Sequence, residues 1–211
     1  MRLMRTVQVT VTRLARHSGV AIVTPMCLFA SAAHAETALG SADAPVTLVE
    51  YGSLTCDHCV RFHREVLPDI KSRYIDTGRL RFVYRNFPTS AAALRGAVAA
   101  RCAGDQYYQM LDALYASVRD WARQDDVDSA LVQQAAAIGL NQKSFGACLD
   151  APRHKRAITR EQRRASREHG VLGTPTFLIN GEVVPGKKNI DEMQDLIEWA
   201  LPDSTVQYQQ H

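Results

Sequence analysis

The chain has 211 residues, of which 46% are hydrophobic and 22% are charged. This balance is typical of a folded domain and excludes a disordered or collagen-like chain. The formal net charge is +3, but residues 1–35 contain four arginines and no acidic residue. The rest of the chain has one more acidic than basic residue, which argues against nucleic acid as a partner.

The amino-terminal segment has the layout of a secretory signal peptide. Its basic residues precede a largely apolar stretch at 19–30, and small residues at positions 33 and 35 match a cleavage site. A membrane anchor is the alternative, but the apolar stretch contains Pro25 and is too short to cross a hydrocarbon core. We therefore expect a signal peptide at residues 1–35, cleaved after Ala35.

The next elements are predicted from apolar periodicity. Residues 46–51 are expected to form a strand, residues 60–74 a helix that Pro68 kinks, and residues 80–87 a second, largely buried strand.

Cys56-Asp57-His58-Cys59 lies between this first strand and the helix. Two thiols at this spacing can form one disulfide, and a helix start favours a thiolate on the first of them. The alternative is half of a structural zinc site with His58 or His63 as further ligands. Such a site needs a second pair of ligands, and no other short Cys/His cluster occurs in the sequence. The motif therefore predicts redox chemistry.

The middle of the chain has helical periodicity. Two apolar stripes, spaced as on one face of a helix, run through residues 107–118 and 127–138, and a short helix is expected at 144–149. Residues 153–169 are dense in charge and predict a long helix that is mostly in contact with solvent.

The last part of the chain predicts a hairpin and a closing helix. Asn180-Gly181 joins two short strands at 176–179 and 182–184 and is typical of a type I′ turn. Asn189 and Glu192 resemble a capping box at the start of a helix. Before the hairpin, Pro175 is expected at the first position of its strand, where an X-Pro bond can be cis.

The chain resembles the DsbA family of thiol–disulfide oxidoreductases of the bacterial periplasm. The resemblance runs from about residue 44 to about residue 199 and depends on two groups of motifs. These are Glu50-Tyr51, Ser53-Leu54-Thr55-Cys56, His58-Cys59 and Arg61-Phe62-His63, and then Gly173-Thr174-Pro175-Thr176-Phe177 and Asn180-Gly181.

The resemblance implies an α/β thioredoxin fold with an inserted all-helical domain. The first part of the thioredoxin fold would then be residues 36–88, the helical insertion residues 89–170, and the second part with the carboxy-terminal helix residues 171–211. It also implies a periplasmic location after removal of the signal peptide.

The resemblance also implies the roles of the site residues. Cys56 would be the exposed nucleophile and Cys59 its buried partner in a redox-active disulfide, and Thr174-Pro175 would be the cis-proline loop that contacts substrate. His58 would donate a hydrogen bond or charge to the Cys56 thiolate, or else be a solvated loop histidine.

Two further positions follow the family pattern only in part. Glu50 occupies the place of an acidic residue beneath the active site, where it would relay the proton of Cys59; the alternative is an edge-strand glutamate in water. His63 stands where some family members have a second acidic residue, so a second acidic relay is not expected.

Cys102 and Cys148 are expected to form a structural disulfide in an oxidising compartment, a pairing that some family relatives also have. Both are expected to point into the core of the helical segment. The alternative is a pair of buried free thiols.

The functional expectation is an enzyme that donates the Cys56–Cys59 disulfide to reduced exported proteins, as a monomer, without cofactor or metal. A quinone-linked membrane oxidase would then recycle it. A disulfide isomerase or reductase is the first alternative, because Thr174 before the proline resembles those enzymes. Only residues 36–45 would precede the first strand, which disfavours an added dimerisation domain. The second alternative is a module in which Cys56 and Cys59 bind Cu(I) or Zn(II).

Overall fold

The computed structural model describes residues 37–202; the predicted signal peptide lies outside the described residues. Its sheet contains four strands within that range, β1 (Val46–Gly52), β2 (Leu80–Asn86), β3 (Thr176–Ile179) and β4 (Glu182–Pro185), in the order β2-β1-β3-β4. Strand β2 is parallel to β1, whereas β3 is antiparallel to both β1 and β4. The α/β class predicted from the sequence is confirmed.

The helix after β1 begins earlier than its periodicity suggests. It consists of α1 (Asp57–Arg61), the π-helical segment η1 (Phe62–Val66), α2 (Leu67–Ile70) and a second π-helical segment, η2 (Lys71–Ile75). Cys56 is the N-cap of α1, so the active-site motif itself forms the first turn. Because Pro68 has no N–H to donate to the preceding turn, the wider π geometry on either side accommodates it.

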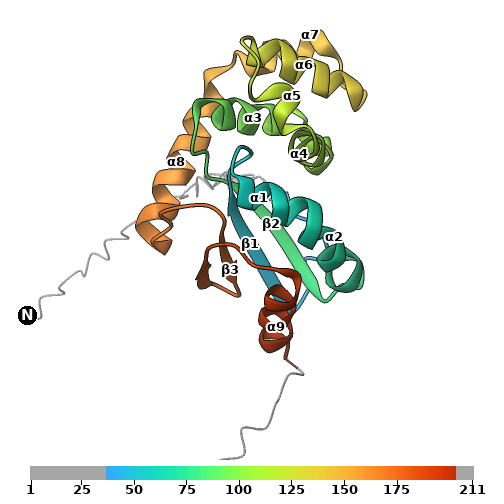
Figure 1. The fold of residues 1–211 in the computed structure, drawn as a ribbon, viewed down its shortest axis with the longest axis vertical. Helices are drawn as coiled ribbons and strands as arrows, with labels where there is room; N and C mark the ends of the chain where they lie inside the picture. The colour runs from blue at the N-terminus through green and yellow to red at the C-terminus, as the bar shows by residue number, and fades with distance from the viewer. Residues whose placement is uncertain (1–36, 203–211) are drawn as a thin grey trace, which may run out of the picture. The chain divides into compact units, whose positions relative to one another are not determined.

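A run of helices separates β2 from β3, as the sequence predicted. They are α3 (Ala91–Cys102), the 3₁₀ turn η3 (Gly104–Gln106), α4 (Tyr107–Ala116), α5 (Val118–Trp121), α6 (Val127–Ala137), α7 (Gln142–Leu149) and α8 (Pro152–His169). The predicted stripe at 107–118 is divided between α4 and α5 at Ser117, whose hydroxyl donates to the Ala113 carbonyl. Figure 1 shows α3 to α7 as one group, from which α8 leads back toward the sheet.

The two faces of the sheet are buried by different helices. Leu48 of β1 belongs to a large core shared with α1, η1, α2, the helical segment and α9 (Ile190–Ala200). Val49 and Tyr51 belong to a smaller core on the other face, where Ala165 of α8 covers them. Because successive strand residues point to opposite faces, Glu50 lies on the same face as Leu48. Its carboxylate is therefore directed into the layer between the sheet and the first helix.

The carboxy-terminal hairpin and helix confirm their sequence signals. Asn180 and Gly181 both have positive φ, 48° and 94°, as a type I′ turn requires. The Asn189 side chain accepts from the Glu192 N–H while the Glu192 carboxylate accepts from the Asn189 N–H, which completes the capping box. In the part of the chain that the structure describes, no helix is long and apolar enough to span a membrane.

Candidate active site

The Cys56–Cys59 motif lies where β1 passes into α1. Cys56 is half-buried and caps the helix, while Cys59, one turn on, is fully buried in the main core. Both are free thiols in this structure. The Cys56 carbonyl accepts from the Val60 N–H at 2.9 Å, which fixes the first cysteine against the start of the helix. A substrate can therefore reach Cys56 and not Cys59.

The loop before β3 completes the site from the far end of the chain. The Thr174–Pro175 peptide bond is cis, as the sequence pattern suggested. The Cys56 sulfur lies 3.3 Å from the Thr174 carbonyl oxygen, across 118 residues of sequence. A peptide bound beside Cys56 would meet this loop.

The two thiols have opposite electrostatic environments. The pKa of Cys56 is lowered to about 5, mainly by a hydrogen bond from the Cys59 thiol. The Thr174 side chain and the backbone N–H groups of Cys59 and His58 lower it further, and burial of the sulfur opposes this lowering only in part. The pKa of Cys59 is raised far above its ordinary value by that same bond to Cys56, by burial and by the charge of Glu50. At neutral pH the reduced site thus holds a Cys56 thiolate and a protonated Cys59.

His58 differs from its sequence-based expectation. Its backbone N–H contributes to the stabilisation of the Cys56 thiolate. Its imidazole, however, is exposed and accepts a hydrogen bond from the Arg61 guanidinium at Nδ1. The contribution of His58 to the thiolate therefore comes from its backbone, while Nδ1 of its imidazole is engaged by Arg61 on the exposed side of α1.

Glu50 is neither at an edge nor in water. Strand β1 is central in the sheet, and the Glu50 side chain is 0% exposed. Its Oε2 lies 2.7 Å from Nε2 of His63, whose side chain is 2% exposed. Sequence analysis missed this contact. The available signal was helical spacing: His63 follows Cys59 by four residues and so shares its buried face.

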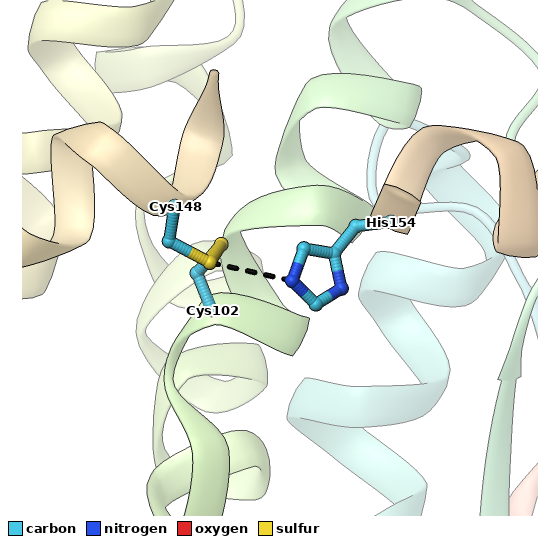
Figure 2. A group of neighbouring side chains, drawn as sticks. All are labelled: Cys102, Cys148 and His154. Atoms are coloured by element: carbon cyan, nitrogen blue, oxygen red, sulfur yellow. Dashed lines mark hydrogen bonds between the residues drawn. A yellow bond between two sulfur atoms is a disulfide. The ribbon is translucent and has the colours of Figure 1, made fainter. Parts of the chain in front are cut away.

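Cys102 and Cys148 form the expected disulfide, with 5.8 Å between their Cα atoms. Both residues are half-buried rather than enclosed in the helical core, because they lie at the end of α3 and near the end of α7. Figure 2 shows His154 of α8 beside them, with Nε2 3.4 Å from the Cys148 sulfur. Among the described residues these three are the group whose ligand atoms are close enough for a metal ion. Both sulfurs, however, are bonded to each other in the disulfide, so His154 is the only one of the three that keeps a free metal-binding atom.

The fold and the site define a class of protein: a thioredoxin-like chain whose Cys56–Cys59 pair begins a helix and faces a cis-proline loop. A family model described as Thioredoxin matches residues 32–199. The crystal structure of alpha-DsbA1 from Wolbachia pipientis is 31% identical, with a TM-score of 0.71, over 76% of this chain and 88% of that one. The chain belongs to the DsbA family of thioredoxin-like proteins.

Two sequence relatives have names of the same kind. A protein-disulfide oxidoreductase of Rickettsia prowazekii is 28% identical over 79% of this chain, which spans 62% of the length of that relative. Disulfide bond formation protein D of Bacillus cereus is 26% identical over 79% of each chain.

Proposed function

We propose that this protein is a thiol–disulfide oxidoreductase that gives the Cys56–Cys59 disulfide to reduced exported proteins. The observation that supports this most directly is the stabilised Cys56 thiolate, with a pKa of about 5. A dithiol whose reduced form is stabilised in this way gives up its disulfide readily and is therefore an oxidant.

The proposed reaction has two exchange steps. A substrate thiolate attacks the Cys56 sulfur, the Cys56–Cys59 bond breaks, and Cys59 leaves as a thiolate that takes up a proton. A second substrate thiolate then attacks the substrate sulfur of the mixed disulfide, and Cys56 leaves as its stabilised thiolate. The substrate gains one disulfide and the enzyme is reduced by two electrons.

The remaining site residues have supporting roles in this proposal. Thr174 and Pro175 contact the bound peptide beside Cys56, and the backbone of His58 stabilises the thiolate. Glu50 receives or returns the proton of Cys59, because it is buried close enough for its charge to act on that thiol. The helices within residues 89–170 are an insertion that covers the site without supplying a reacting group.

The proposal also includes the cellular setting. Residues 1–35 are a signal peptide, the mature protein acts as a periplasmic monomer, and a quinone-linked membrane oxidase restores its disulfide. The names of the relatives, protein-disulfide oxidoreductase and disulfide bond formation protein, support substrate proteins as partners of this kind of enzyme.

The test is oxidative refolding of a reduced, disulfide-containing substrate by the oxidised protein. We expect stoichiometric formation of disulfides by the wild-type protein and no activity in Cys56→Ser. When Cys59→Ser is mixed with a substrate that already contains disulfides, its Cys56 thiolate should attack one of them, and mixed disulfides should accumulate because the internal thiol that would release them is absent. Activity in both variants would contradict the exchange mechanism.

A disulfide isomerase or reductase is the second candidate, favoured by Thr174 in place of valine before the cis-proline. Refolding of a scrambled substrate by the reduced protein distinguishes it. An isomerase would restore the native pairing, whereas an oxidase of this kind would not.

A further inference from the structure

The Glu50–His63 pair is a buried polar contact within a hydrophobic layer. Both side chains are almost fully inaccessible, and their hydrogen bond is 2.7 Å long. Burying two such groups is costly unless each satisfies the other. Glu50 Oε1 and His63 Nδ1 make no hydrogen bond to the described residues, so the contact between Oε2 and Nε2 is the one hydrogen bond of the pair there.

The surroundings of the pair fix its geometry. In the sheet, Glu50 is flanked in register by Tyr84 of β2 and Phe177 of β3. The imidazole of His63 stacks on the Tyr115 ring of α4, with 3.9 Å between centroids and 18° between planes. Stacking on Tyr115 fixes the orientation of the imidazole, and the position of Glu50 within β1 fixes its carboxylate. The two groups are therefore held in hydrogen-bonding contact.

The other groups near His63 do not compete with this bond. The hydroxyls of Tyr84 and Tyr115 share one hydrogen bond of 2.8 Å, in which one donates and the other accepts. Burial raises the pKa of both phenols well above the ordinary value, so they are neutral near pH 7. Asp112 of α4 is the nearby carboxyl besides Glu50; burial raises its pKa while the charge of His63 opposes that shift.

We propose that His63 is a positioning residue whose Nε2–H holds Glu50 as an ionised carboxylate, ready to accept the proton of Cys59. This proposal rests on the proposed exchange function. A buried carboxylate without a donor favours its protonated form and cannot then act as a base. A hydrogen bond from a neighbouring N–H favours the ionised form instead. His63 therefore determines over which pH range Glu50 can act.

The step affected is closure of the active-site disulfide. When Cys56 is joined to a small thiol such as glutathione, the Cys59 sulfur attacks Cys56 and forms the Cys56–Cys59 bond. The Cys56–glutathione bond breaks, glutathione leaves as a thiolate with the bonding electron pair, and the Cys59 proton passes to Glu50. The mixed disulfide itself is the oxidant in this step: Cys59 is oxidised, the glutathione sulfur is reduced, and Cys56 stays at the disulfide level.

The experiment compares His63→Phe, which keeps an aromatic ring, with His63→Gln, which keeps a side-chain N–H. The reduced proteins are mixed with glutathione disulfide, and quenched samples are analysed by mass spectrometry. Formation of the mixed disulfide reports the attack by Cys56, and its decay reports closure by Cys59. Tyr115→Phe is the matched control, because it removes a hydroxyl and leaves the stacked ring.

We expect closure in His63→Phe to need a pH about one unit higher than in the wild-type protein, and so to be slower on the acidic side of the profile, since a hydrogen bond to a charged group is lost. His63→Gln should retain the wild-type pH profile, and Tyr115→Phe should not change it. The rate at which Cys56 forms the mixed disulfide should be the same in the wild-type protein and in all three variants. A wild-type profile in His63→Phe, or a profile in His63→Gln as shifted as in His63→Phe, would overturn the proposal.

A second measurement does not depend on any variant. In protein labelled with ¹⁵N-histidine, His63 should carry its proton on Nε2 near neutral pH. A proton on Nδ1 with a bare Nε2 would show that His63 is not the donor, and would overturn the proposal. If the wild-type protein formed no mixed disulfide with glutathione, the exchange function would fail, and this measurement would still decide the role of His63.

Discussion

At the scale of single residues, Cys56 and Cys59 are three residues apart on one helix, yet their thiol pKa values are shifted in opposite directions. Cys56 caps the helix, and its sulfur accepts hydrogen bonds from backbone N–H groups, whereas Cys59 is enclosed by the core. Backbone donors favour a thiolate and burial opposes one. The two thiols therefore differ in exposure and in the direction of their pKa shifts because of their positions.

Asp57 is the residue at which this motif departs most from the proline-containing form of its family. Its carboxylate is exposed, in the first turn of α1, next to the Cys56 thiolate. At a separation of about 6 Å and an effective dielectric of roughly 40, the repulsion between two such charges is about 1.4 kcal/mol. We expect Asp57→Asn to lower the pKa of Cys56 by about one unit and to make the protein more oxidising by about 30 mV.

Thiolate absorbance at different pH values and equilibration with glutathione measure these two quantities. Asp69→Asn, on an exposed position of α2, is a suitable control for the charge change alone. An unchanged or raised pKa of Cys56 in Asp57→Asn would rule out the electrostatic explanation.

At the scale of secondary-structure elements, the Cys102–Cys148 disulfide joins the end of α3 to α7 across 46 residues. In the chain-entropy model, closing a loop of this length stabilises the folded state by about 4 kcal/mol. The bond holds together the helices of the insertion and contributes no group to the Cys56 site. Its role is therefore expected to be structural.

The double variant Cys102→Ser/Cys148→Ser should accordingly lose up to about 4 kcal/mol of unfolding free energy in urea. Its Cys56 alkylation rate should equal that of the wild-type protein, because the active site lies on other elements. Wild-type stability in the double variant would mean that α3 and α7 are held by packing alone.

At the scale of the whole molecule, the lowered pKa of Cys56 makes the free energy of unfolding of the reduced protein depend on pH. The folded reduced protein has a Cys56 pKa of about 5, below the ordinary value of a thiol. The unfolded chain therefore binds more protons between the two values, so the reduced form gains stability as the pH rises above 5. This contribution is complete above the unfolded pKa of about 8.5 and is lost as the pH falls through 5.

We therefore expect the difference in unfolding free energy between reduced and oxidised protein to grow from about pH 5 to about pH 8. Below that range it should be constant. Urea unfolding of both forms at each pH provides the measurement, with Cys56→Ser as the control that lacks the thiolate. A difference that did not vary with pH would indicate that the thiolate is not stabilised by folding.

Most of the strands, helices and turns of this protein could be predicted from patterns of residues that are close together in the sequence. The strand and helix around Cys56, the Asn180-Gly181 turn and the capping box at Asn189 depend on residues a few positions apart, and each has the expected geometry. The start of the first helix was placed too late, because the motif has little apolar periodicity although its first cysteine caps the helix. The pairing of Cys102 with Cys148 followed from compartment and family resemblance.

The amino-acid sequence by itself determined the redox motif, the order of the elements and the family. Only the tertiary structure decided that the Thr174 carbonyl contacts Cys56, that the His58 imidazole contacts Arg61, and that Glu50 pairs with His63. Glu50 and His63 are 13 residues apart, on a strand and on the helix that packs over it. Helical and strand periods assign each of them to a buried face, but their contact depends on how those two faces pack, and no local pattern specifies that.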